Sequence, residues 1–519
     1  MTLHAPKTLR RSFAVVAAVV VAAVALSGCL YAAIPEDGSS GGGGATSVPQ
    51  PSETPSDLDG FYAQELAWAE CGTGFECATA LAPLDYNDLS VGVMKLALVR
   101  HEASSGAPVG SLLTNPGGPG GSGVSFIQDS LDYAIGTELQ DNFDVIGFDP
   151  RGVGDSSAVT CFDAADMDAY LYDIPVAPRG TPEWEDELQE RNTRFAEACE
   201  ANSNGILEYI TTENSARDLD LLRAVLGDEE LYYIGFSYGT FLGSVYAKLF
   251  PENVGRLVLD GALDPSVSSV MVGATQMVGF ENSLRAYMAD CLEGSGCPFT
   301  GTVDEGISDV QALLASVATN PLESSDGRML GADSMLTGII LPLYSADNWS
   351  LLSDAFSAAL AGDPDMMFFL ADFYNGREGG QYTDNSSEAF RAYNCMDYPD
   401  DSTDADVAEA DALMAADAPT FAPYWDGPDA CAVWPYPPSG VREIITAEGA
   451  PPIVVVGTTG DPATPYAWSV ALADQLASGV LVTNKGEGHT GYNKGNDCVD
   501  AAVDDYLISG VVPTDGACG

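Results

Sequence analysis

The chain has 519 residues, 46% of them hydrophobic, which is enough apolar material for a large core and excludes global disorder. Its 76 acidic and 20 basic residues give a formal net charge of −56. Such a surface repels phosphate backbones, so we expect no nucleic-acid partner.

The first 28 residues have the pattern of an export signal. A basic stretch between Lys7 and Arg11 precedes an apolar run from Phe13 to Leu26, which is short for a membrane span. The run ends in Leu26-Ser27-Gly28-Cys29, which resembles a bacterial lipobox, although small residues there also suit an ordinary signal peptidase. We therefore expect a signal peptide over 1–28 and a diacylated Cys29 that anchors the exported chain on the extracytoplasmic face of the cell membrane, with release also possible.

Residues 29–58 are predicted to be a linker. Gly, Ser, Pro and Thr dominate from residue 36 onwards, and no apolar periodicity is present. A flexible segment behind a lipid anchor would hold the following domain away from the membrane.

Eleven cysteines are present, and lipidation of Cys29 would leave an even number. An oxidising compartment favours disulfides, and sequential pairing is the simplest of many connectivities. No tight Cys-x-x-Cys pattern occurs and histidine is scarce, so we expect no metal site. Sequential pairing would join Cys71 with Cys77, Cys161 with Cys199, Cys291 with Cys297, Cys395 with Cys431 and Cys498 with Cys518.

Short, continuously apolar runs separated by helical stretches predict an α/β fold with a mostly parallel sheet covered by helices on both faces. The core of this fold would be formed by two parts of the chain, residues 59–265 and 446–519. A mainly helical lid over 266–445 would be inserted between late strands, with amphipathic helices at 303–319, 349–361 and 404–416. The predicted strands are 91–99, 111–114, 143–148, 231–236, 256–260, 452–457 and 479–482.

Ser237 lies at the centre of Gly235-Phe236-Ser237-Tyr238-Gly239, where a β-rich run meets a helix-compatible run. This context is typical of a nucleophile elbow, in which a serine is exposed on a sharp turn between a strand and a helix. The turn requires small residues two positions before and after the serine, which Gly235 and Gly239 provide. We therefore predict that Ser237 is a catalytic nucleophile.

A serine nucleophile needs a base, and only three histidines are available. His4 is lost with the signal, and His101 precedes the serine, where we expect a structural or surface role. His489 follows the last predicted strand and is the predicted base. The predicted acid is Asp461, after the strand at 452–457, because chain order in this fold is Ser, acid, His.

An oxyanion hole needs backbone N–H groups that converge on one point. One is expected from Tyr238, directly after Ser237. The other is expected from the glycine-rich segment 115–121 after an early strand, where glycines permit the unusual dihedral angles required. Of its glycines we favour Gly118 over Gly117.

These motifs together resemble the proline iminopeptidase branch of the α/β-hydrolases and, more closely, the secreted tripeptidyl aminopeptidases of actinobacteria. The resemblance covers roughly residues 60–519. It implies cofactor-free release of short peptides from free N-termini, with Ser237, Asp461 and His489 as the triad. Pro116 replaces the histidine that iminopeptidases have before Gly-Gly-Pro-Gly, which argues against strict proline specificity. The matching segments are 116–120, 149–156, 235–240, 250–254, 259–261, 461–465 and 486–489.

Two alternatives stay open: an esterase or lipase on the same scaffold, and a binding protein without activity. An aminopeptidase also needs a carboxylate for the substrate's α-ammonium, which we expect in or beside the lid. Glu213 is a candidate, although its position also suits a helix cap. Oligomeric state is not indicated.

Overall fold

The computed structural model describes residues 50, 54–399, 402–425 and 427–519. The predicted signal peptide, Cys29 and most of the predicted linker lie outside these residues. The last linker residue, Leu58, begins helix α2 (Leu58–Tyr62), which Asp57 caps through a 2.8 Å hydrogen bond from the Gly60 amide. None of the described helices is long and apolar enough to cross a membrane.

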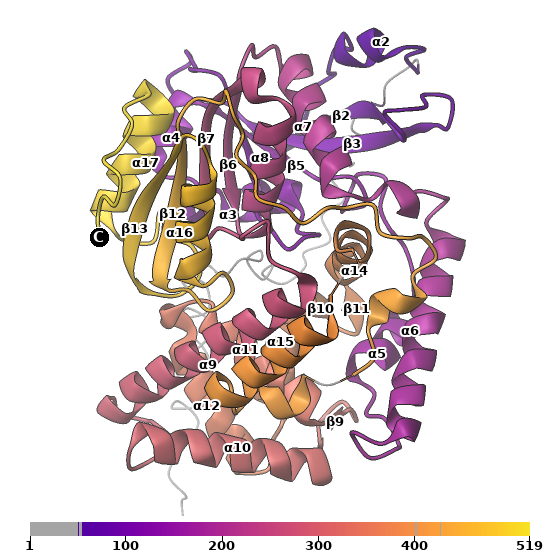
Figure 1. The fold of residues 1–519 in the computed structure, drawn as a ribbon, viewed down its shortest axis with the longest axis vertical. Coiled ribbons are helices and arrows are strands. Elements are labelled where there is room, and N and C mark those ends of the chain that lie inside the picture. The colour runs from indigo at the N-terminus through magenta and orange to yellow at the C-terminus, as the bar shows by residue number, and fades with distance from the viewer. Residues whose placement is uncertain (1–49, 51–53, 400–401, 426) are drawn as a thin grey trace, which may run out of the picture.

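A nine-stranded sheet in the order β1-β2-β3-β5-β4-β6-β7-β12-β13 forms the centre of the molecule (Figure 1). From β5 to β13 neighbouring strands are parallel, and β1, β2 and β3 add antiparallel pairs at one edge. The predicted α/β class is confirmed. Strands β1 and β2 were not predicted, because they are rich in small residues and have no continuously apolar run of large side chains. The strands are β1 (Ala69–Gly72), β2 (Phe75–Pro83), β3 (Val93–His101), β4 (Ser111–Asn115), β5 (Asp144–Phe148), β6 (Leu231–Phe236), β7 (Val254–Asp260), β12 (Ile453–Gly460) and β13 (Gly479–Glu487).

Helices cover both faces of the sheet. Side chains alternate along each strand, so Ile453 and Val455 of β12 join one buried cluster while Val454 and Val456 join another. Continuous apolar runs are therefore required in these strands. The first cluster lies under α7 (Thr212–Leu226), α8 (Tyr238–Leu249) and α16 (Tyr466–Gln475), and the second under α3 (Gly123–Ala134), α4 (Thr137–Asn142) and α17 (Asp497–Ser509).

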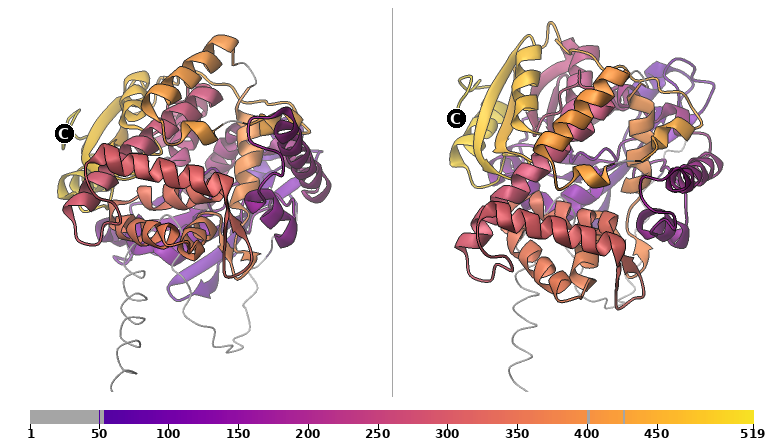
Figure 2. Two further views of the ribbon diagram at one scale, coloured as in Figure 1. Left: turned by 90° about the horizontal axis from the view of Figure 1, so that it is seen from below. Right: turned by 60° about the horizontal axis from the view of Figure 1, so that its bottom comes forward.

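The predicted helical insertion lies between β7 and β12 and gathers at one end of the sheet (Figures 1 and 2). It has its own apolar core, which includes Met288, Ile339 and Phe356. Its elements are α9 (Ser269–Glu293), α10 (Val303–Thr319), β8 (Leu322–Glu323), β9 (Met329–Leu330), α11 (Ala332–Leu343), η3 (Ala346–Asn348), α12 (Trp349–Leu360), α13 (Asp365–Tyr374), β10 (Arg377–Glu378), β11 (Gln381–Tyr382), α14 (Ser386–Asp397), α15 (Asp404–Asp417), η4 (Ala422–Tyr424) and η5 (Ala430–Val433).

Helix α14 differs from the rest of the insertion because it packs into the main core. Ala389, Ala392 and Tyr393 belong to the same buried cluster as Tyr238 and Leu242 of α8. A second excursion, not predicted, separates β5 from α7 and lies beside the insertion in Figure 1. It holds α5 (Ala164–Tyr172), α6 (Pro182–Asn202) and η1 (Leu207–Tyr209); η2 (Pro251–Asn253) precedes β7.

Five disulfides join the ten described cysteines, and their pairing is sequential, which is one of the many connectivities that the sequence left open. Two of the bridges connect distant elements: Cys161 after β5 is bonded to Cys199 of α6, and Cys395 of α14 is bonded to Cys431 of η5. These two thus tie the excursion and the insertion to the segments that lie against the core. Two bridges close short loops and join Cys71 to Cys77 and Cys291 to Cys297, and the fifth joins Cys498 of α17 to Cys518 near the C-terminus.

Candidate active site

Ser237 stands between the last residue of β6 and the first residue of α8, half-buried, with φ 54° and ψ −122°. Its N–H donates to the Asp260 carbonyl oxygen at 2.9 Å. A Cβ on Gly235 would lie 2.4 Å from the Gly239 carbonyl oxygen. The chain therefore turns so sharply at Ser237 that only glycine fits at Gly235, which is the geometry of a nucleophile elbow.

His489 and Asp461 form a buried pair. His489 Nδ1 lies 2.9 Å from each carboxylate oxygen of Asp461, and both residues are almost inaccessible to solvent. His489 Nε2 is buried and makes no hydrogen bond among the described residues. The carboxylate therefore binds the imidazole through one nitrogen only, which is the arrangement that the predicted role of His489 as a base requires.

The Asp461 carboxylate is fixed by the loop that follows β12. It accepts hydrogen bonds from the backbone amides of Ala463, Thr464 and Thr490, and from the Thr464 hydroxyl at 3.0 Å. Thr464 Oγ1 also lies 3.2 Å from His489 Nδ1. With this many donors, the carboxylate serves as an acceptor and cannot rotate away from the histidine.

The His489 ring is in contact with two residues that are distant in sequence, Gly261 and Tyr344. A Cβ on Gly261 would lie 3.2 Å from His489 Cε1, so a larger residue would crowd the ring. Tyr344 also packs edge-on against the ring, with the ring centroids 5.5 Å apart, and its carbonyl oxygen accepts the backbone N–H of His489 at 2.8 Å. Tyr344 caps α11, so the insertion contributes directly to the site. No local sequence pattern marks it.

The glycine-rich segment after β4 lies against the elbow. A Cβ on Gly117 would be 2.8 Å from Ser237 Cβ and 3.2 Å from Tyr238 N. The Gly117 N–H donates to Asn115 Oδ1, so Gly118, with φ 110°, is the better oxyanion donor of the two. Tyr238 is the first residue of α8, and its N–H has no intrahelical acceptor.

Asp260, at the end of β7, is a site residue that local motifs did not reveal. Its fully buried carboxylate accepts the N–H groups of Gly491 and Tyr492, just beyond His489, at 2.8–3.0 Å. Burial raises the pKa of Asp260 to about 6, and the two amides partly offset this. Since its carbonyl accepts the Ser237 N–H, Asp260 bridges the serine turn and the histidine loop. In the sequence, the only indication of a role for Asp260 was that residues 259–261 match the tripeptidyl aminopeptidases.

Two further residues were considered from the sequence: His101, for which a structural or surface role is expected, and Glu213. His101 pairs with Val145 at the start of β5, whereas Ser237 follows the end of β6, so the two residues lie at opposite ends of the parallel strands. The His101 ring packs against Phe75. Glu213 lies in the first turn of α7 and pairs with Arg217 at 2.8 Å, while Thr211 provides the cap through the Asn214 amide. The cap that was the alternative role for Glu213 is therefore provided by Thr211, two positions earlier.

A parallel sheet with a serine on a sharp turn after one strand and a buried His–Asp pair after two others defines an α/β-hydrolase with a serine hydrolase site. The chain belongs to the family of actinobacterial serine hydrolases that includes the serine protease Hip1. A family profile described as "TAP-like protein" matches residues 418–518.

Three relatives illustrate the range of this family. The serine protease Hip1 of Mycobacterium tuberculosis (strain H37Rv) is 35% identical over 478 residues, covering 88% of this chain and 91% of the relative. Carboxylesterase B of the same strain is 36% identical over 487 residues, covering 91% and 92%. The tripeptidyl aminopeptidase of Streptomyces coelicolor is 29% identical over 466 residues, covering 86% and 84%.

Proposed function

We propose that this protein is a serine exopeptidase that releases short peptides, tripeptides first of all, from free N-termini, with Ser237, His489 and Asp461 as its triad. The observation that carries this proposal is the buried His489–Asp461 pair, whose Nε2 makes no hydrogen bond among the described residues, on a loop that Asp260 links to the sharp turn at Ser237. The names of the Hip1 and tripeptidyl aminopeptidase relatives support peptides as substrates.

In the proposed mechanism, Ser237 Oγ attacks the substrate carbonyl carbon while His489 Nε2 takes the hydroxyl proton. Asp461 stabilises the imidazolium that forms. The amides of Tyr238 and Gly118 bind the oxyanion of the tetrahedral intermediate. The C–N bond then breaks, His489 protonates the leaving amine, and water attacks the Ser237 ester by the same steps in reverse roles.

An esterase is the second candidate, because a relative of similar identity is named carboxylesterase B. Both reactions use the same acyl-enzyme chemistry, so the triad alone does not separate them. The difference lies in recognition of a free α-ammonium, which only an aminopeptidase requires.

The test compares Ala-Ala-Ala and Ala-Pro-Ala nitroanilides, each with a free and an acetylated N-terminus, with short nitrophenyl esters. We expect cleavage of the free tripeptides and much slower cleavage of the acetylated ones. Ester turnover without hydrolysis of any free-amine peptide would exclude the peptidase, and equal rates on acetylated peptides would indicate an endopeptidase. Activity that survives Ser237→Ala would refute the triad itself.

We also propose that the enzyme is exported and anchored through lipidation of Cys29. The support is the sequence alone: a basic start, a short apolar run and Cys29 in the lipobox position. Metabolic labelling with palmitate should label the natural chain and leave Cys29→Ala unlabelled. Labelling of both, or of neither, would contradict the anchor.

A further inference from the structure

Helix α14 touches the segment that carries the proposed donor Gly118. A Cβ on Gly120, which has φ 104°, would lie 2.7 Å from the Ser386 carbonyl oxygen and 3.1 Å from Ala389 Cβ. The first turn of α14 therefore packs directly on the glycine segment, and a side chain at Gly120 would push the two apart.

The last turn of α14 reaches the other proposed donor, Tyr238, through a buried chain of hydrogen bonds. Thr212 Oγ1 donates to Asp397 Oδ2 at 2.6 Å, and the Thr212 amide donates to Asp397 Oδ1 at 2.9 Å. Thr212 Oγ1 lies 2.5 Å from the Tyr238 hydroxyl. Because the single Thr212 hydroxyl proton goes to Asp397, Tyr238 is the donor in its bond to Thr212.

The carboxylate at the end of this chain is buried and accepts two hydrogen bonds from Thr212. Burial raises the pKa of Asp397 to about 6, while the two Thr212 bonds act against that rise. Thr212, Tyr238 and Asp397 are all nearly inaccessible to solvent. The hydrogen bonds therefore run in one direction, from the Tyr238 hydroxyl through Thr212 to Asp397.

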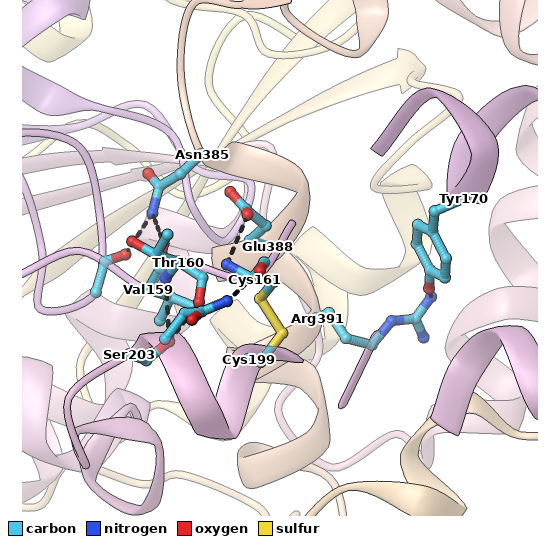
Figure 3. Close-up of a disulfide and its surroundings, with 11 residues drawn as sticks. Val159, Thr160, Cys161, Tyr170, Cys199, Ser203, Asn385, Glu388 and Arg391 are labelled. Atoms are coloured by element: carbon cyan, nitrogen blue, oxygen red, sulfur yellow. Dashed lines mark hydrogen bonds between the residues drawn. A yellow bond between two sulfur atoms is a disulfide. The ribbon is translucent and has the colours of Figure 1, made fainter. Parts of the chain in front are cut away.

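Helix α14 is itself held firmly by polar side chains. Asn385, at its N-cap, donates to the carbonyl oxygens of Gly152 and Val159 and accepts the Gly154 amide. Glu388 accepts the Cys161 amide at 2.9 Å beside the Cys161–Cys199 disulfide (Figure 3). In mid-helix, Tyr393 lies 2.6 Å from the Ser215 hydroxyl, donates to the Arg151 carbonyl and packs against the Tyr238 ring.

We propose that α14 positions both halves of the oxyanion hole, with Thr212 and Asp397 as positioning residues for Tyr238. Donors stabilise an oxyanion only when they are preorganised at about 2.7–3.1 Å, so a small displacement of either amide slows the chemical step. This inference rests on the proposed acyl-transfer role of Ser237, but not on the substrate being a peptide.

The test removes single hydroxyls. In Tyr238→Phe and Thr212→Val the Tyr238 side chain loses its anchor, and we expect kcat to fall about tenfold with KM within about twofold, less than the 100-fold or more of a deleted donor. A tripeptide aldehyde, which forms a tetrahedral adduct with Ser237, should bind more weakly by the same factor. Thr212→Ser retains the hydroxyl and should recover most of kcat.

Tyr246→Phe is the matched control. Tyr246 is another buried tyrosine of α8, and its hydroxyl donates to Asp220 instead. This variant should lose comparable thermal stability and keep the natural kcat. Equal kcat in Tyr238→Phe, Thr212→Val and the natural enzyme would overturn the inference, as would an equal fall in Tyr246→Phe.

Nitrophenyl acetate separates this inference from the proposed peptidase activity. If no peptide is cleaved, the same variants are measured on the ester, whose oxyanion forms in the same place. A tenfold fall there supports the role of α14 even when the peptidase proposal fails. If both variants hydrolyse the ester as fast as the natural enzyme, the role of α14 is rejected, whatever the outcome for the peptidase proposal.

Discussion

Replacing Asp260 by asparagine tests whether a buried charge holds the histidine loop in its active position. The carboxylate accepts two backbone amides beyond His489, and Gly491 N lies within 3.0 Å of both oxygens. Asparagine offers one acceptor oxygen, and its NH₂ group would face the Gly491 N–H. We expect the loop to shift and kcat to fall at least about tenfold, which corresponds to about 1.4 kcal/mol.

The same substitution should also change how the stability of the protein depends on pH. The pKa of Asp260 is raised from 3.8 to about 6, so the folded state binds a proton more readily than the unfolded state. Stability contributed by this group therefore falls as the pH rises from about 4 to about 6, by about 3 kcal/mol in total. Asparagine resembles the neutral acid and carries no such penalty.

Urea unfolding at pH 4.5 and pH 7, with kcat measured on the preferred substrate, tests both parts. We expect Asp260→Asn to lose less stability than the natural enzyme between these pH values, while it is less active at pH 7. Two other buried carboxyls, Asp149 and Asp397, also have pKa values of about 6 and are present in both proteins. The difference in pH dependence between the natural enzyme and the variant therefore reports on Asp260. Full activity in Asp260→Asn, or an unchanged pH dependence of stability, would refute the reasoning.

Three further substitutions test other parts of the structure. Asp461→Asn should lower kcat about 10⁴-fold without unfolding the protein, as judged by circular dichroism, because the imidazole loses its orienting acceptor; a loss below tenfold would contradict the assignment. Arg151→Met should lower the free energy of unfolding, measured in urea, by about 3–5 kcal/mol, because it leaves the buried Asp218 charge without its partner. The double variant Arg151→Met with Asp218→Asn should lose less, since it removes that charge as well. Replacing Cys161 and Cys199 by alanine should lower stability by up to about 4 kcal/mol for a sequence separation of 38, and an unchanged unfolding midpoint would show that the bridge is dispensable.

Local sequence was sufficient for the elements that carry the proposed triad. Ser237 was found because an elbow requires Gly235 and Gly239 within five residues, and because a continuously apolar run predicts β6 wherever the rest of the chain lies. His489 was found by elimination among three histidines. Asp461 followed from chain order and is the acid that the structure places on His489 Nδ1.

What surrounds the triad was decided by contacts between distant segments. Asp260 reaches Gly491 across a sequence separation of 231, and Thr212 reaches Asp397 across 185. Nothing in the neighbourhood of these residues indicates a partner, since a buried carboxylate and a helix-capping one look alike in sequence.

The sequence by itself determined the seven strands of the sheet from β3 onwards, the serine turn and the order of the proposed triad residues, because these depend on side-chain periodicity and on local backbone requirements. Only the tertiary structure decided that α14 packs with the main core, that Tyr344 seats the histidine, and which residues hold each donor amide in place. Those features depend on burial and hydrogen bonding between segments that come together only when the sheet has formed.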